Sequence, residues 1–509
     1  MLLHQEFIKN AKKRSAQTAI KDKSTNTELS WNQTLIGALI LTRKYRKYEP
    51  GYIGIMVPTS AGCALATAAA LMSGRVPVMI NYSTGAENNI NYAREKCKFQ
   101  TVITSKALLE KIGCPVMEGM VLLEDLMKGV KPGEKLAAAL HAKLPLPLLL
   151  KSVHRGHEDD KAAILFTSGS EKDPKVVPLT HRNLASNIRD FYVHLGIKEG
   201  DVLLAILVFF HIFGLTVNLW LSFVKGVTML TYANPTEFQT ISKIAREERP
   251  TMMVATPSFY WGYLQKSEDG DFSSLRLMVA GADKCPDALR EGFRQKHGTV
   301  LLEGYGTTET SPVISSNNLI DNRPGSIGKP IPNVEIRIEN VETGELCKPG
   351  ETGKIVTRSE SVMKGYLNAP ELTAEVLVDG WYDTGDMGYL DKDGYLFHAG
   401  RFKRFVKVGG EMISLVWVES IMEQYLPNGV NCCVVEIPDE VKGSTIVAAV
   451  NSEINKIALL RKMSRDLPNI ALPRQFFIIE KLPVMGSGKI DFRTVSKMVG
   501  KMAAASGAG

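Results

Sequence analysis

One short stretch of the chain combines the residue types that bind polyphosphate. Residues 167–177 read TSGSEKDPKVV, so small and hydroxyl residues precede Lys175. Backbone N–H groups and hydroxyls in such a loop donate to phosphate oxygens, and the lysine supplies positive charge. The stretch lacks the GxxxxGK[ST] pattern of a Walker A motif. We therefore expect a nucleotide-phosphate loop of another kind; the plainer interpretation is a polar turn after the apolar run AAILF.

Further segments with chemically useful side chains follow along the chain. Glu309 offers a carboxylate that suits a hard cation, and Asp386 offers one that accepts hydroxyl groups. Each residue also fits a plain structural role when it is taken singly. Glu309 could be an acid at a helix start, Asp386 a turn residue, and Arg401, in the later segment GRFKRF, one member of a surface ion pair. Their joint spacing favours one active site. The segments, in order, are FFHIFG (209–214), VAGAD (279–283), EGYGTTE (303–309), GWYDTGD (380–386), GRFKRFVKVGGEMIS (400–414) and GSGKID (486–491).

The elements that must position these residues alternate between strand and helix. Apolar runs such as YIGIMVP and VPVMI are separated by helical stretches such as SAGCALATAAALMSG. Similar runs recur at DVLLAILVFF, GVTMLTY, TMMVATP, LRLMVAG and TVLLEGYG. This order predicts an α/β fold with largely parallel sheets flanked by helices on both faces.

The texture of the chain changes near Val334. Short alternating strands with Gly/Asp turns, as in WYDTGDMGYLDKDGYLFHAGR, predict a small antiparallel, barrel-like region. After Arg401 the chain reads as a compact mixture of helices and strands. We expect a large N-terminal domain over 1–400, a small mobile α+β domain over 401–501, and a disordered tail over 502–509.

Composition narrows the class of protein. The chain has 509 residues, with 44% hydrophobic and 23% charged residues, as in an ordinary globular protein. Seven cysteines without CxxC or Cys/His spacing favour reduced thiols in the cytoplasm over a disulfide framework or a zinc site. The first residues, MLLHQEFIKNAKKRS, carry charges where an export signal needs an apolar run, so no such signal is expected. The formal net charge of +7 fits nucleic acid, anionic lipid, an acidic protein or simply a solvated surface.

Three other segments have competing interpretations. The uncharged run 202–224 is long enough to span a bilayer, but His211, Gly214, Thr216 and Asn218 interrupt it, so a buried strand, turn and helix is expected. Residues 131–151 form a basic, leucine-rich stretch, either a surface hairpin or a segment in peripheral contact with a membrane. HRGHED (154–159) matches the HxxxxD spacing of glycerolipid acyltransferases, a pattern that also arises by chance.

Together, these motifs and their order resemble the AMP-forming acyl-adenylate synthetases, a superfamily of acyl-CoA synthetases, peptide-synthetase adenylation domains and firefly luciferase. The resemblance covers nearly the whole chain. TSGSE, AGADK, LLEGYGTTE, GRFKRFVKVGGEMIS and MGSGKIDF look most like the acyl-acyl carrier protein synthetases, the relatives of the synthetase half of 2-acylglycerophosphoethanolamine acyltransferase.

The resemblance implies roles for particular residues around ATP and Mg²⁺. Glu309 is expected to ligate Mg²⁺, and Thr308 to hydrogen-bond the α-phosphate. Lys172 and Val176 stand where the family usually has glycine. The residues expected to bind the nucleotide are Thr167, Ser168, Gly169, Ser170 and Lys175 at the β- and γ-phosphates, Gly281, Ala282, Gly304, Tyr305, Gly306 and Thr307 around adenine and the phosphates, and Asp386 with Arg401 at the ribose.

The resemblance also implies a moving domain and an acyl pocket. Lys489 is expected to bridge the substrate carboxylate and the α-phosphate, and to withdraw when the small domain swings about Lys403 or Arg404. The swing would bring residues 408–412 to line a thiol tunnel. His211 is expected at the mouth of an acyl pocket, with a satisfied core histidine as the plain interpretation; apolar residues placed in the pocket are Phe259, Trp261 and Leu215.

The sequence therefore predicts a ligase. It would convert a fatty acid and ATP into acyl-adenylate and pyrophosphate, and then pass the acyl group to the phosphopantetheine thiol of acyl carrier protein. The basic segment with Lys403, Arg404 and Lys407 is expected to attract such an acidic partner. The alternatives are a fatty acyl-CoA synthetase, an acyltransferase acting on a lysophospholipid, and an inactive lipid-binding relative. No nucleic-acid partner is expected.

Overall fold

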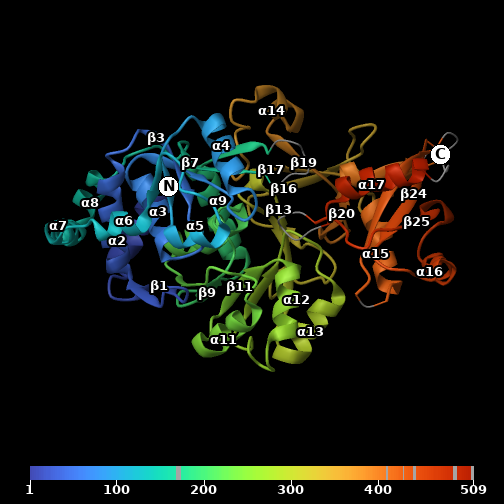
Figure 1. The fold of residues 1–509 in the computed structure, drawn as a ribbon, viewed down its shortest axis with the longest axis horizontal. Coiled ribbons are helices and arrows are strands. Elements are labelled where there is room, and N and C mark those ends of the chain that lie inside the picture. Colours follow the sequence, from blue (N-terminus) through green and yellow to red (C-terminus); the bar gives the residue numbers. More distant parts are fainter. Residues whose placement is uncertain (168–173, 409–410, 428, 440–442, 485–489, 506–509) are drawn as a thin grey trace. The chain divides into compact units, whose positions relative to one another are not determined.

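The chain forms two compact units in a computed structural model, which describes residues 1–167, 174–408, 411–427, 429–439, 443–484 and 490–505 (Figure 1). The described residues of the first unit are 1–167, 174–336 and 357–382. Those of the second are 337–356 and those from 383 onward. The domain border predicted at 400/401 stays a prediction.

The first unit contains two largely parallel sheets, as the strand-helix alternation predicts. In the larger sheet, parallel pairing runs from β1 to β13, and β2, β14 and β15 add antiparallel edges. The strand order is β15 (Lys329–Pro330), β14 (Val313–Ser316), β13 (Leu301–Gly306), β12 (Leu277–Ala280), β11 (Met252–Ala255), β9 (Val202–Ala205), β10 (Thr228–Thr231), β1 (Thr18–Asp22) and β2 (Thr27–Ser30).

The smaller sheet of this unit has six strands. All its neighbours pair in parallel except the last two, β7 and β8, which are antiparallel. Its order is β6 (Met120–Leu122), β5 (Val102–Thr104), β3 (Gly51–Met56), β4 (Arg75–Met79), β7 (Lys161–Phe166) and β8 (Val176–Thr180).

The strands of these sheets bury side chains on both faces, because helices cover both faces. In β11, Met252 and Val254 enter the core cluster shared with the smaller sheet, whereas Met253 and Ala255 face the cluster formed with α11, α12 and α13. The helices are α1 (Leu3–Lys13), α2 (Trp31–Tyr45), α3 (Ala61–Met72), α4 (Ala86–Cys97), α5 (Lys106–Ile112), α6 (Leu123–Lys128), α7 (Pro132–Lys143), α8 (Leu146–Ser152), α9 (His181–His194), α10 (Leu221–Lys225), α11 (Phe238–Glu248), α12 (Pro257–Lys266), α13 (Asp287–His297) and α14 (Pro370–Val376).

The uncharged run 202–224 is buried core, as predicted. It begins with β9 and continues through a loop into a π-helix, Gly214–Trp220, all of whose residues are buried. Among the described helices, none combines the length and apolar character needed to cross a bilayer. All seven cysteines are free thiols, which agrees with the predicted absence of a disulfide framework.

The second unit contains the predicted short strands and a small α+β region. The border between the units runs within β16, β17 and β19. The sheet that this border crosses consists of β16 (Glu335–Glu339), β17 (Gly353–Arg358), β19 (Trp381–Leu390) and β20 (Leu396–Arg401), together with β18 (Leu377–Val378), which lies in the first unit. The second unit also contains the hairpin β21 (Phe405–Val408) and β22 (Glu411–Ser414), and the sheet β23 (Cys432–Asp439), β24 (Gly443–Val450) and β25 (Gln475–Ile478).

Three helices accompany these strands: α15 (Leu415–Tyr425), α16 (Lys456–Met463) and α17 (Phe492–Ala505). The last of them alters one expectation. It includes residues 502–505 of the segment predicted as a disordered tail, because Ala503 is buried in a cluster with Val495 and Val499. Residues 506–509 lie outside the described part.

Three histidines meet where α1 packs beside the start of α9. His4 and His181 are buried, with ring centroids 5.5 Å apart. His4 Nε2 lies 3.0 Å from the carbonyl oxygen of His154, and the Leu3 amide donates to His181 Nδ1. Burial lowers the pKa of His4 from about 6.5 to about 4, and lowers that of His181. These imidazoles are therefore neutral in the folded protein at neutral pH.

We expect acid to destabilise the protein through this cluster. Because the folded pKa of His4 is depressed, the unfolded chain binds the extra proton first, so stability is lost as pH falls from about 6.5 toward 4. Between pH 7 and pH 5 the free energy of unfolding should drop by about 2 kcal/mol from His4 alone. Urea unfolding at both pH values measures this, and His4→Gln should remove that part. His157, whose side chain is 71% exposed, supplies a control, and His157→Gln should leave the pH dependence unchanged. An equal pH dependence in His4→Gln and the unmodified chain would contradict the assignment to His4.

Candidate nucleotide site

The predicted phosphate loop joins two antiparallel strands. Thr167 follows β7 and Lys175 precedes β8; the Thr167 amide donates to the Lys175 carbonyl oxygen at 3.0 Å, and the Lys175 amide donates to Thr167 Oγ1 at 3.1 Å. The Tyr92 hydroxyl donates to the carbonyl oxygen of Pro174. These bonds fix both ends of the loop. Its central members Ser168, Gly169 and Ser170 lie outside the described residues.

Lys175 and Glu309 are brought together through Tyr366. Lys175 Nζ lies 5.0 Å from the centroid of the Tyr366 ring, and the Tyr366 hydroxyl donates to Glu309 Oε1 at 2.9 Å. Backbone bonds hold the same three segments: Leu367 N donates to the Val176 carbonyl oxygen, and Met363 N to that of Glu309. One tyrosine thus contacts a cation with its ring and a carboxylate with its hydroxyl.

Tyr366 contacts two of the candidate site residues, Lys175 and Glu309, and was not predicted from the sequence. It lies in KGYLNA (364–369), a loop before α14 that shows no strand or helix pattern. The sequence offered only the neighbouring glycine, Gly365. The structure explains that glycine, because its φ of 140° is one that only glycine adopts readily. A glycine-tyrosine pair in a loop is too common to point to a site alone.

The carboxylate of Glu309 fits a magnesium ion held together with nucleotide phosphates. Glu309 is 8% exposed, and its Oε1 has a hydroxyl donor, which orients the group. Within the described ranges, no three His, Cys, Asp or Glu side chains cluster as a metal cage would require. Mg²⁺ is commonly bound by one or two carboxylates plus substrate phosphates, so a single well-oriented acid meets its needs.

The predicted adenine segments lie at the carboxyl ends of neighbouring parallel strands. Gly281 and Ala282 follow β12, and Gly304–Gly306 end β13, with Ala280 opposite Glu303 in the register. Ligands of open α/β sheets bind at this edge. A Cβ on Gly281 would lie 3.1 Å from the ring of Phe213, so the FFHIFG segment packs directly against this loop.

Close packing explains Gly306, the second glycine in EGYGTTE. A Cβ on Gly306 would lie 1.8 Å from the carbonyl oxygen of Pro312, a distance that no side chain tolerates. The Thr307 amide bonds to Pro312 O and to Thr310 Oγ1, which starts the short 3-10 helix Thr308–Thr310. Glu309 lies in that helix. The backbone of this motif therefore sets the position of the carboxylate.

His211 is half-buried, and its neighbours form a tight turn. Its carbonyl oxygen accepts the Leu215 amide at 2.9 Å, and its Nδ1 lies 3.4 Å from the Phe213 amide. Of the residues predicted in the acyl pocket, Leu215 is fully buried in the core, whereas Phe259 and Trp261 are partly buried. Their role in substrate binding stays a prediction.

The second unit carries the predicted ribose residues side by side. Asp386 in β19 lies opposite Arg401 in β20, and Arg401 Nε is 2.9 Å from Asp386 Oδ1. His398 Nε2 is 3.4 Å from the same oxygen. Asp386 is buried while the Arg401 side chain is 61% exposed, so the guanidinium offers a charge to solvent. Lys489 lies outside the described residues.

The predicted basic docking segment requires a correction. Arg404 is buried, bonds to Glu419, and stacks on the Phe492 ring, with its Cζ 4.7 Å from the ring centroid. Lys407 pairs with Glu342 at 3.1 Å. Arg404 therefore contributes no surface charge, and the prediction that it attracts an acidic partner is wrong.

Comparisons with known proteins agree with this arrangement. The family model described as "AMP-binding enzyme" matches residues 7–367, and "AMP-binding enzyme C-terminal domain" matches residues 418–489. A long-chain-fatty-acid–CoA ligase from Bacillus subtilis is 35% identical over 348 residues, or 65% of this chain and 61% of that protein. An oxalate–CoA ligase from Arabidopsis thaliana is 31% identical over 352 residues, covering 67% of this chain and 68% of that protein. The matched region thus spans about three fifths of the Bacillus relative.

Solved structures show the same fold. ATP-bound MatB from Rhodopseudomonas palustris superposes with a TM-score of 0.84 at 23% identity, covering 99% of this chain and 100% of the other. The o-succinylbenzoate CoA synthetase from Bacillus subtilis, in complex with ATP and magnesium ion, gives 0.82 at 23% identity and covers 97% of this chain and 99% of its own.

Proposed function

Because this chain belongs to the AMP-binding enzyme family, we propose that it activates a fatty carboxylate with ATP and transfers the acyl group to the thiol of coenzyme A. The contact of Lys175 and Glu309 with the same side chain, Tyr366, carries the proposal. The first step gives acyl-adenylate and pyrophosphate, and the second gives a thioester and AMP.

The first step needs charge and alignment more than it needs a base. A fatty carboxylate is already ionised at neutral pH, so its attack on the α-phosphate requires stabilisation of the negative charge that builds up on phosphate oxygens. Lys175 supplies a cation at the end of the phosphate loop. Glu309 would hold Mg²⁺, which neutralises charge on the phosphates when bound. Thr308 and the half-buried Tyr305 lie within the same motif as Glu309.

The remaining site residues keep their proposed roles. Asp386 accepts ribose hydroxyls, and Arg401, whose side chain is largely exposed, supports the ribose and phosphates. Lys489 bridges the carboxylate and the α-phosphate, as the motif GSGKID implies. A swing of the small domain about Lys403 or Arg404 would exchange Lys489 for residues 408–412 between the two steps.

The names of the curated relatives favour coenzyme A as the acceptor. Curated proteins at 35% and 31% identity are named long-chain-fatty-acid–CoA ligases. Acyl carrier protein, favoured by the motif resemblance alone, is the second candidate, and the burial of Arg404 removes one of its supports. Transfer to a lysophospholipid is weaker still, because the HRGHED carboxylate of Asp159 is engaged by Arg182 and Lys364.

We expect thioester formation with coenzyme A to exceed that with holo-acyl carrier protein, tested with one fatty acid and equal thiol concentrations. Pyrophosphate release should require ATP, Mg²⁺ and the fatty acid in both assays. Efficient turnover with the carrier protein and none with coenzyme A would reverse the choice of acceptor. Absence of pyrophosphate release with any fatty acid would refute the adenylation step itself.

A further inference from the structure

The helical hairpin α7–α8 presents three of its leucine side chains outward. In α7, Leu136 and Leu140 are 62% and 57% exposed, whereas the small Ala138 and Ala142 on the opposite side are buried. Leu148 in α8 is 51% exposed. A surface helix of a globular protein normally places its large apolar residues toward the core. Leu136, Leu140 and Leu148 do the reverse, whereas Leu149 is buried and Leu144, Leu146 and Leu150 pack against the core.

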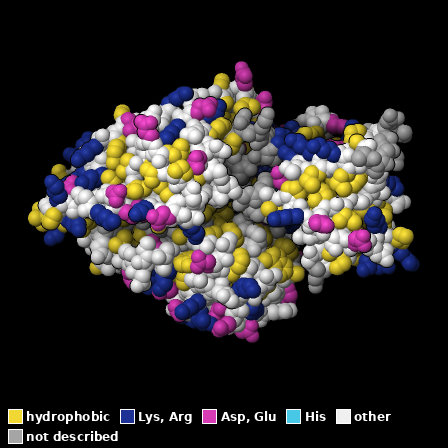
Figure 2. All heavy atoms as spheres, viewed as in Figure 1, with side chains coloured by type: hydrophobic (Ala, Val, Ile, Leu, Met, Phe, Trp, Pro, Cys, Tyr) yellow, Lys and Arg dark blue, Asp and Glu magenta, His cyan; other side chains and the backbone are white. Residues whose placement is uncertain are grey.

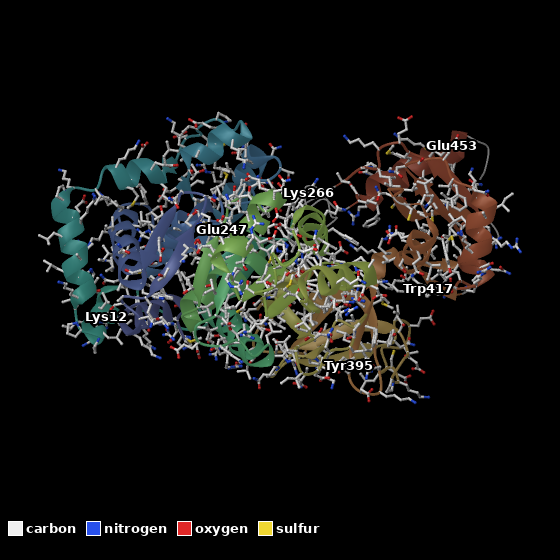
Figure 3. The ribbon with its side chains drawn as sticks, turned by 90° about the horizontal axis from the view of Figure 1, so that it is seen from below. Lys12, Glu247, Lys266, Tyr395, Trp417 and Glu453 are labelled. Carbon is white, nitrogen blue, oxygen red and sulfur yellow. The ribbon has the colours of Figure 1, made fainter. Side chains whose placement is uncertain are left out.

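Polar contacts hold the hairpin in this orientation. On its inner side, Glu134 binds Lys44 Nζ of α2 at 2.8 Å, and Lys12 Nζ, labelled in Figure 3, donates to the carbonyl oxygen of Ala142 at 3.0 Å. His141 Nε2 lies 2.6 Å from Ser152 Oγ, which joins α7 to the end of α8. The outward leucines are therefore fixed by the fold.

Basic residues surround the leucines. Residues 127–151 contain five lysines and one glutamate, and that glutamate is the one paired with Lys44. Lys143 follows Leu136 and Leu140 on the same helical face, at spacings i, i+4 and i+7. Figure 2 shows hydrophobic and basic side chains together where Figure 1 draws α7. The exposed lysines are Lys128, Lys131, Lys135, Lys143 and Lys151.

We propose that the α7–α8 hairpin docks the protein on the surface of an anionic lipid bilayer. The outward leucines enter the boundary between headgroups and acyl chains, while the lysines contact lipid phosphates. A second copy of the chain fits less well, because two such surfaces would bring ten lysines together. Docking here needs no helix that spans the membrane. It would place the enzyme where free fatty acids partition.

Vesicle flotation with the full chain tests the proposal. We expect binding to vesicles of phosphatidylcholine mixed with phosphatidylglycerol, weaker binding to phosphatidylcholine alone, and release by high salt. The double variant Leu136→Ser/Leu140→Ser should lower binding to the mixed vesicles about tenfold. Lys135→Glu/Lys143→Glu should abolish the preference for the anionic lipid.

A matched control replaces exposed apolar residues elsewhere. Leu346 and Ile457 are 68% and 82% exposed, so Leu346→Ser/Ile457→Ser removes comparable surface and should bind vesicles like the unmodified chain. All variants are compared at equal helix content by circular dichroism. No binding to anionic vesicles, or equal losses in the leucine variant and the control, would overturn the proposal. Self-association that the leucine variant abolishes, without vesicle binding, would assign the surface to a second copy instead.

Discussion

Replacing Glu309 with glutamine is expected to reduce acyl-adenylate formation about a thousandfold, because a hard cation loses several kcal/mol of its anionic coordination. Glutamine has nearly the same shape, and its amide oxygen still accepts the Tyr366 hydroxyl, so the fold should be unchanged. The measurement is fatty-acid-dependent pyrophosphate release across a magnesium titration. Fatty-acid binding, measured without ATP, should change little.

Tyr366→Phe separates the charge of Glu309 from its orientation. This variant removes the hydroxyl that binds Oε1 but keeps the aromatic ring beside Lys175. We expect acyl-adenylate formation to fall about tenfold, since one hydrogen bond to a charged group is worth far less than the charge itself.

A Glu309→Gln enzyme with normal activity at every magnesium concentration would show that the metal is bound elsewhere.

The parallel sheets were predictable because their signal is local. In β11 and β12 every residue is buried, since one face packs in the core shared with the smaller sheet and the other on α11, α12 and α13. Such strands appear in a sequence as short continuous apolar runs. The motif EGYGTTE was identified by its resemblance to a known family, and the conformation of its Gly306 depends on Pro312, only six positions away.

Residues that depend on distant partners were not predictable. Arg404 looked like a surface charge among Lys403 and Lys407, but Glu419 and Phe492 enclose it. Tyr366 gains its importance only when the fold brings it between Lys175 and Glu309, which are separated by 134 positions in the chain. The type of a residue indicates which interactions its side chain can make, whereas long-range packing determines which partners it contacts.

The second large effect is expected at Lys175. Methionine keeps most of the aliphatic stem over the Tyr366 ring and removes the charge, so Lys175→Met should lower kcat/KM for ATP about a hundredfold through the loss of a charge-assisted bond to phosphate. The KM for the fatty acid should stay within a few-fold of the unmodified value. Lys175→Arg, which retains the charge, should recover part of the activity.

Lys225 supplies a matched control for the loss of a lysine–tyrosine contact. Its Nζ lies 4.6 Å from the ring centroid of Tyr192, in a setting like that of Lys175 over Tyr366 but outside the proposed site. If the cation–π contact mattered only for stability, Lys225→Met and Lys175→Met would lower the melting temperature alike and leave ATP kinetics alone. If Lys175 binds phosphate, only its variant loses affinity for ATP. An unchanged KM for ATP in Lys175→Met would exclude this lysine from the nucleotide site, and would leave the loop's backbone and hydroxyl groups as the remaining phosphate ligands.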